Sequence, residues 1–238
     1  MQVLASVTSQ PTKSNLSAVV RFRELAMRLS QLGASVGVNI APFSDQSLPH
    51  FANIPTERQN FAIDDLQRYL SICEDTINRG HSLKNAPQFL WSALKKFGFR
   101  PTSDFFQYID SESMIEIHNR EFQQIFRTFN FYECCSYTIE DLYCFPWTSL
   151  YRHESHIETN LIILAAEMYG GKHSATKKLD WPIHMIEELS SKNKYVISAH
   201  MKYCSPLFEE GTGVVGATAI IETGTVLNPR RLNLEGMA

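Results

Sequence analysis

The segment 211–216 reads Gly-Thr-Gly-Val-Val-Gly, which is the glycine spacing of a dinucleotide-binding loop. Such a loop stands between a strand and a helix, so that the helix N-terminus faces the pyrophosphate of the cofactor. Here β-branched residues follow and favour a strand, and the chain ends at residue 238, too soon for the rest of a nucleotide-binding unit. We therefore expect a hairpin turn, a closely packed strand glycine at Gly216 and no dinucleotide cofactor.

Cys134, Cys135, Cys144, His153 and His156 carry side chains of the kinds that bind metals or act as nucleophiles. Zinc sites usually hold their ligands in short knuckles, and adjacent cysteines cannot easily serve one tetrahedral site. No local signature of a catalytic thiol accompanies the cysteines, and no phosphate loop, Gly-x-Ser-x-Gly or His-Glu-x-x-His motif occurs. We expect free thiols, no metal, no cofactor and no enzymatic activity.

The composition is that of a globular protein, with 44% apolar residues, 20% charged residues and a net charge of −3. Residues 101–238 carry 11 Lys and Arg against 18 Asp and Glu, a poor surface for phosphate backbones. The longest apolar run, 161–166, is far shorter than the ~20 residues that span a bilayer, and no apolar secretory block opens the chain. We expect a cytoplasmic protein that binds neither membranes nor nucleic acid; if the source is eukaryotic, a nuclear location stays open.

The elements that position these residues change in character along the chain. Residues 1–100 show the 3.6-residue apolar period of helices, predicted near 16–32, 56–80 and 87–97. The third helix begins at Pro87 and ends before Gly98, which suits a helix start and stop. Its apolar stripe consists of Phe89, Leu90, Leu94 and Phe97.

After Pro101 the pattern becomes one of short strands around a set of helices. Thr138 and Asp141 resemble a short capped turn, whereas Ser155 and Glu158, like Thr56 and Gln59 earlier in the chain, have the spacing of a capping box at a helix start. A helix is predicted around Phe122, Ile125 and Phe126, and another from Ser155 to the glycines at 170–171. The predicted strands are 105–109, 114–117, 179–185, 195–203 and 214–222.

This order of elements, over about residues 105–223, resembles a PAS domain. The stretch FFQYIDSESMIEIHNREFQQIF looks like the opening hairpin and first helix of that family, with Asn119 and Phe122 at matching places. SYTIEDLYCFPWTSLYRHES looks like its short helices, and KYVISAHMKYCSPLFEEGTGVVGATAIIET like its last two strands and their turn. The cysteine motif of the flavin-binding members is absent.

The resemblance implies an α+β fold, namely a five-stranded antiparallel sheet of order 2-1-5-4-3 with helices on one face. The third strand would then lie on an edge, where Pro182 is tolerated. Residues 214–222 would form the central strand. The resemblance also places several aromatic residues on the inner face of the sheet, and they either pack as a core or line a small-molecule pocket. The pocket candidates are Trp147, Tyr151, Trp181, Tyr195 and His200.

The implied role is that of a sensory or protein-interaction module in signalling or transcription regulation. The chain would divide into a helical region (1–100), a PAS-like domain (101–224) and a C-terminal tail (225–238). A ligand, a protein partner or a second copy of the chain would act by favouring one packing of the flanking helix that carries Phe89, Leu90, Leu94 and Phe97.

Two other functions stay open at this stage. A small enzyme on a PAS-like scaffold would require a convergent base and nucleophile in a pocket, because fold does not fix function. A DNA-binding regulator would require a basic stripe on one helix of residues 14–32, where Arg21, Arg23 and Arg28 occur with Glu24 between them.

Overall fold

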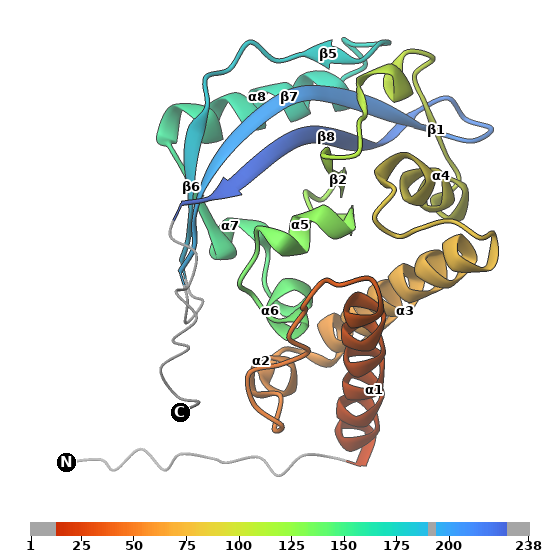
Figure 1. The fold of residues 1–238 in the computed structure, drawn as a ribbon, viewed down its shortest axis with the longest axis vertical. Coiled ribbons are helices and arrows are strands. Elements are labelled where there is room, and N and C mark those ends of the chain that lie inside the picture. The colour runs from red at the N-terminus through yellow and green to blue at the C-terminus, as the bar shows by residue number, and fades with distance from the viewer. Residues whose placement is uncertain (1–12, 190–193, 228–238) are drawn as a thin grey trace.

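A computed structural model describes residues 13–189 and 194–227, and much of the expected C-terminal tail therefore lies outside the described residues. Four helices form the first part of the chain and gather on one side of an antiparallel sheet (Figure 1). Their bounds are α1 Lys13–Ser35, α2 Pro49–Asn53, α3 Thr56–Asn78 and α4 Ala86–Phe97.

Helix α4 confirms the prediction for the flanking helix. Asn85 caps its N-terminus by accepting a hydrogen bond from the backbone N–H of Gln88, and Gly98 ends it in the left-handed conformation. Phe89, Leu90 and Leu94 are buried, and the Phe89 ring contacts Phe126 of the sheet at 4.9 Å between ring centroids. The apolar stripe of α4 thus packs on the sheet, with Phe97 half-buried at its end.

The sheet is antiparallel throughout, and among the described residues it has eight strands rather than the expected five. The main path runs β3-β2-β8-β7-β6-β4, and β1 and β5 pair with β7 beside it. One edge of β7 pairs with β8, and its other edge pairs in turn with β6, β5 and β1. The bounds are β1 Phe99–Pro101, β2 Met114–Asn119, β3 Gln124–Arg127, β4 Tyr151–His153, β5 Lys177–Lys178, β6 His184–Glu188, β7 Val196–Glu209 and β8 Val215–Val226.

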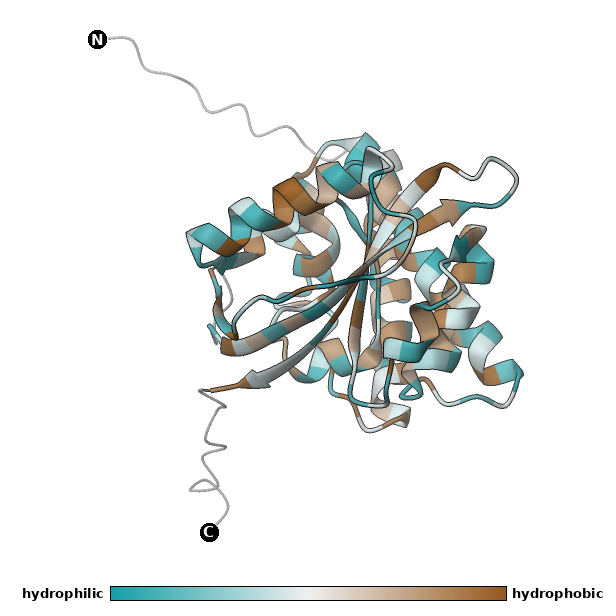
Figure 2. Ribbon diagram, turned by 90° about the horizontal axis from the view of Figure 1, so that it is seen from above, coloured by the Kyte–Doolittle hydropathy of each residue, from teal (hydrophilic) through white to brown (hydrophobic). Residues whose placement is uncertain are grey.

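Helices cover both faces of this sheet, which differs from the expected one-sided arrangement (Figure 2). Successive residues of a strand point to opposite faces. Ile115 and Ile117 of β2 join the core shared with α3 and α4, whereas Met201 and Cys204 of β7 pack against α8 on the other face. The remaining helices are α5 Phe129–Glu133, α6 Ile139–Cys144, α7 Trp147–Leu150, α8 Ser155–Tyr169 and the 3-10 helix η1 Phe105–Tyr108.

The large core cluster runs without a break from Phe22 of α1 to Ile221 of β8. The helices before residue 100 therefore share their apolar interior with the sheet that follows. A change in the packing of the sheet is consequently felt by α3 and α4, which is the physical requirement for communication between the two parts of the chain.

The expected edge strand 179–185 is wrong in both extent and place. Strand β6 begins only at His184, and it lies between β7 and β4. Pro182 stands before the strand because it has no N–H to give to a ladder. Strand β4, which immediately precedes α8, lies at this edge of the sheet instead.

Two other predicted elements change type. The expected strand 105–109 contains the 3-10 helix η1, in which Phe105 is buried. The expected helix around Ile125 and Phe126 is strand β3, which forms a hairpin with β2 through a turn where Phe122 has a positive φ of 58°. Both segments are short and aromatic, so local periodicity does not separate helix from strand.

The predicted helix starts have different outcomes. At the expected short capped turn, Thr138 and Asp141 form a capping box at the start of α6, each side chain accepting a hydrogen bond from the other's backbone N–H. The box expected at Thr56 and Gln59 does not form, because Pro55 is the N-cap of α3. The box at Ser155 and Glu158 does not form, because α8 starts one residue earlier than that box requires, with Glu154 at the N-cap.

The glycine segment forms a hairpin and a strand, as expected. Gly211 and Gly213 have positive φ angles of 90° and 70° in the turn between β7 and β8. Gly216 lies in β8, where an added Cβ would meet Glu209 Cγ at 2.6 Å and Phe99 Cε1 at 2.8 Å. The crowding comes from neighbouring strands rather than from a covering helix.

We expect Gly216→Val to lower the free energy of unfolding by about 1–3 kcal/mol, the usual cost of overpacking. Chemical denaturation measures this loss. Val214→Ile, at an exposed position in the same hairpin, is the matched control. It should change the free energy of unfolding by no more than about 0.5 kcal/mol. Equal stability of Gly216→Val and the parent protein would contradict the packing described here.

Candidate functional site

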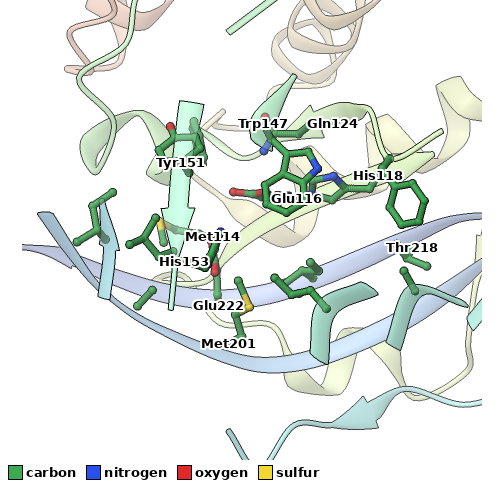
Figure 3. Close-up of a pocket in the computed structure, with 18 of the residues that line it drawn as sticks. Met114, Glu116, His118, Gln124, Trp147, Tyr151, His153, Met201, Thr218 and Glu222 are labelled. Carbon is green, nitrogen blue, oxygen red and sulfur yellow. Dashed lines mark hydrogen bonds and ion pairs between the residues drawn. The ribbon is translucent and has the colours of Figure 1, made fainter. Parts of the chain in front are cut away.

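An apolar cavity lies between the sheet and the segment formed by α7, β4 and α8 (Figure 3). Its volume is about 100 Å³, of the order of the apolar cavity of about 150 Å³ that holds one benzene ring. The sheet contributes the side chains that alternate away from α4, among them Glu116 and His118 of β2. The other lining residues include Met114, Gln124, Phe131, Cys134, Trp147, Tyr151, His153, Leu161, Ala165, Ile186, Ile197, Ala199, Met201, Thr218, Ile220 and Glu222.

Phe122 and Ile162 mark the mouth of this cavity. Both line it, and Phe122 is 45% and Ile162 56% exposed. Phe122 comes from the β2–β3 turn and Ile162 from α8. These two residues therefore border the cavity where it opens toward solvent.

The polar groups of the cavity are concentrated on β2 and β8. The His118 Nε2 atom lies 3.1 Å from Glu116 Oε2, and these two side chains form an ion pair when the imidazole is protonated. Although burial opposes it, the hydrogen bond and charge of His118 hold the pKa of Glu116 below its usual range. Glu116 is therefore a carboxylate at neutral pH.

The pKa of Glu222 on β8 is shifted in the opposite direction. Its residue is only 5% exposed, and its Oε2 atom has no hydrogen-bond partner. Burial, together with the adjacent Glu116 carboxyl group, raises the pKa of Glu222 well above its usual range. The cavity thus contains one ionised carboxylate and one neutral carboxylic acid side by side.

One histidine of β4, His153, lines the same cavity. Its ring centroid lies 5.7 Å from that of His184 of β6. Burial, reinforced by His184, lowers the pKa of His153 to about 4, so its imidazole is neutral at pH 7. The Nδ1 atom of His153 is buried without a hydrogen-bond partner. It is the second unpaired polar group at this site.

Arg127 connects the site to the helices. It is the cross-strand neighbour of Glu116 and is 2% exposed, with its guanidinium over the rings of Phe131 and Tyr143 at 5.4 Å. Its Nε and Nη1 atoms have no hydrogen-bond partner. Because arginine stays charged in proteins, this is a buried positive charge balanced by nearby carboxyl groups.

Helix α3 supplies the other end of this connection. The Tyr69 hydroxyl donates a hydrogen bond of 2.7 Å to the backbone carbonyl of Arg127. Burial raises the pKa of Asp65 to about 7, against the opposing charges of Arg127 and Arg68. A series of electrostatically interacting side chains, the charge chain, therefore runs from Glu222 through Glu116 and Arg127 to Asp65 on α3.

The pocket residues proposed from the sequence are only partly brought together. Trp147 and Tyr151 line the cavity. Trp181 packs against the apolar cluster beneath α8, and Tyr195 against Ile186, Ile197 and Ala199. His200 does not line the cavity, whereas its neighbours Ala199 and Met201 do.

The sequence analysis missed Glu116, Glu222 and Arg127, the residues that give the cavity its charge pattern. A signal was present, because Glu222 ends an otherwise uncharged apolar strand and Glu116 interrupts another. Charged residues are rarely buried unless they are paired. Both glutamates point toward one cavity, but this can be recognised only once the strand register is known.

The cysteines show no sign of an activated thiol. All five are free, and burial raises the pKa of Cys134 to about 11 and of Cys135 to about 12. The Cys135 Sγ atom lies 3.2 Å from the Tyr151 hydroxyl. Over residues 13–189 and 194–227, the His, Cys, Asp and Glu side chains form no group of three that could hold a metal ion.

The arginines of α1 make contacts within the protein. Arg21 and Arg23 hydrogen-bond to Gln67 and to the carbonyl of Gln46, and Arg28 forms an ion pair with Glu74. These contacts disfavour a DNA-reading face on α1. Among the described residues, no helix has the length and apolar character that crossing a membrane requires.

Comparisons of the chain with models of protein families, with curated proteins and with solved structures find no match.

Proposed function

We propose that the protein is a sensory module that binds a small molecule in this cavity and transmits binding to the helices on the far side of the sheet. The observation that carries the proposal is the apolar cavity with its mouth at Phe122 and Ile162 and its polar groups on β2 and β8. Ligand sites are typically apolar hollows with a few placed polar groups.

The order of strands supports a PAS-like module. If β4 and the short strands β1 and β5 are set aside, β3-β2-β8-β7-β6 corresponds to 2-1-5-4-3 counted along the chain. The cavity lies between this sheet and the helices that connect β3 to β6. The proposal assigns α3 and α4 the part of the flanking helices, since their apolar residues share the core of the sheet.

The route of transmission is the charge chain. A ligand that changes the charge or position of Glu222 or Glu116 alters the field at Arg127, which is packed between the sheet, α5 and α6. Arg127 in turn interacts with Asp65 and accepts, through its carbonyl, the hydrogen bond from Tyr69. A ligand shifts the packing of α3 only if it binds more tightly to one of two arrangements of these side chains than to the other.

The experiment combines a neutral probe with a pair of variants on α8. Benzyl alcohol is titrated while the thermal midpoint is followed, because a ligand at a hundred times its Kd stabilises by about 2.7 kcal/mol. Ala165→Phe fills the cavity, whereas Ala166→Phe places the same ring on the exposed face of the helix. We expect saturable binding in the parent and in Ala166→Phe, and none in Ala165→Phe.

Hydrogen exchange of the same samples tests transmission. Benzyl alcohol should change amide protection in α3 and α4 as well as around the cavity in the parent protein, and should leave it unchanged in Ala165→Phe.

Native mass spectrometry of the freshly purified protein provides a search for a natural ligand. Absence of any bound molecule together with no binding of benzyl alcohol would refute the proposal, as would binding that leaves α3 and α4 unaffected.

One observation favours a second function, that of a small enzyme. Glu116 and Glu222 are carboxyl groups whose pKa values are shifted in opposite directions in one cavity, a pattern found in acid–base catalysis. The two carboxyl groups interact directly with each other, however, whereas a catalytic carboxyl pair leaves room for a substrate atom between its members. We therefore prefer the sensory function.

A further inference from the structure

We propose that the ligand of this cavity is a small apolar molecule bearing a protonated amine, which binds at the Glu222 carboxyl group. This inference rests on the proposed function, since it names the chemistry of the ligand for the same site. Its basis is that Glu222 lines the cavity, is 5% exposed and has an unpartnered Oε2 atom. A buried polar atom without a partner is costly, and a ligand donor that reaches it removes the cost.

The unpaired groups around the cavity are suited to a ligand that donates hydrogen bonds. Besides Glu222 Oε2, the Nδ1 atom of His153 is buried without a partner, and both residues line the same space. A neutral imidazole and a carboxylate both accept hydrogen bonds. An alkylammonium group offers three N–H donors and no acceptor. It could therefore satisfy Glu222 and His153 together.

The charge pattern discriminates between classes of ligand. Glu116 is already ionised, and Glu222 is neutral because burial, together with the negative charge of Glu116 beside it, opposes its ionisation. An anionic group placed at Glu222 would add a further carboxylate beside Glu116 and would be repelled there. A cationic ligand brings the charge that allows Glu222 to ionise, its proton passing to solvent, so that the cavity keeps the same net charge.

The aromatic residues suit the same class. Trp147 and Tyr151 line the cavity, with Trp147 in ring contact with His118 at 6.4 Å and with His153 at 5.7 Å (Figure 3). Tryptophan and tyrosine faces attract cations and also pack against apolar groups. The remaining lining is aliphatic, which suits a short hydrocarbon or a single ring attached to the amine.

The titratable groups that line the cavity with Glu222 are Glu116 and His118 from β2, His153 and Tyr151 from β4, and Cys134 from the C-cap of α5. At pH 7, burial keeps the Cys134 thiol and the Tyr151 hydroxyl protonated, because it raises the pKa of each above its usual range. Glu222 is therefore the acid that we expect to lose a proton when an amine binds.

The experiment compares benzylamine, benzyl alcohol and benzoate, which have the same ring and differ in charge. Titration calorimetry of the parent protein at pH 7 should show benzylamine binding at least about tenfold more tightly than benzyl alcohol, the effect of one charge-assisted hydrogen bond. Benzoate should not bind. Affinity for benzylamine should rise with pH over the range in which Glu222 ionises, until the amine itself loses its proton.

Glu222→Gln keeps the shape of the neutral acid and removes its ability to ionise. This variant should bind benzylamine about tenfold more weakly than the parent protein, and its affinity should no longer rise with pH. Its affinity for benzyl alcohol should be unchanged. Glu187→Gln, on β6 outside the cavity lining, is the matched control. Benzyl alcohol binding as tightly as benzylamine would overturn the amine assignment and leave the sensory proposal standing. Failure of all three probes together with no copurified ligand would overturn both.

Discussion

Replacing Arg127 by methionine should lower the free energy of unfolding by about 3–5 kcal/mol, the usual result of leaving a buried charge without its counter-charge. Methionine keeps much of the volume but removes the charge that balances Glu116 and Asp65. It also removes the cation that lies over Phe131 and Tyr143. Urea denaturation at pH 7, followed by circular dichroism, measures the change.

Arg152→Met is the matched control for this experiment. The Arg152 side chain is 64% exposed in an ion pair with Glu187, so its removal should cost no more than about 1 kcal/mol. A double variant, Arg127→Met with Glu116→Gln, should recover part of the loss, because the carboxylate left without a counter-charge is then gone. If Arg127→Met were as stable as the parent, the charge chain from the cavity to α3 would have no energetic basis.

The second large effect is a pH dependence that originates in α3. Asp65 is 8% exposed and its pKa is about 7, against an ordinary value of 3.8. The folded state therefore holds this proton more tightly than the unfolded state. The stability that results is fully present below the ordinary pKa and is lost as pH rises through about 7. A shift of this size corresponds to roughly 4 kcal/mol.

Asp65→Asn should abolish this loss. At pH 8 we expect the variant to be more stable than the parent by about 3–5 kcal/mol, whereas near pH 4 the two should be similar. Denaturation at a series of pH values gives both curves, and their difference isolates Asp65 from the other carboxyl groups. Asp64→Asn, at the exposed neighbouring position, should follow the parent curve. Parallel curves for the parent protein and Asp65→Asn would show that Asp65 ionises normally.

Some features of the fold were predictable because their causes are local. Asn85, Pro87 and Gly98 define the ends of α4 through capping and backbone conformation, and the stripe that includes Phe89 gives its buried face. The turn at Gly211 and Gly213 follows from the positive φ that glycine tolerates. Each of these signals lies within a few residues of the element that it defines.

Other features depend on partners distant in the chain. Residues 124–127 form a strand because they pair with β2 and because Phe126 packs on Tyr69 and Phe89, which no local window contains. Helices on both faces of the sheet are likewise a property of the whole chain.

The candidate site was harder still to predict, because its essential groups are charged residues inside an apolar core. Glu116, Arg127 and Glu222 come from three different strands. Glu116 and Glu222 acquire their unusual protonation from burial and from charged neighbours, so no pattern in any one strand reveals it.

The position of β7 and β8 in the sheet has a consequence for how the chain folds. These strands come last among the described elements, yet they stand at the centre of the sheet and complete the core that α3 and α4 begin. Their pairings with β1 and β2 join residues far apart in sequence, and such pairings form slowly because loop closure precedes the gain from pairing. During synthesis on the ribosome, the helices therefore emerge with their apolar stripes uncovered. Until residues 196–226 arrive, these surfaces are sites at which chaperones or other nascent chains can bind.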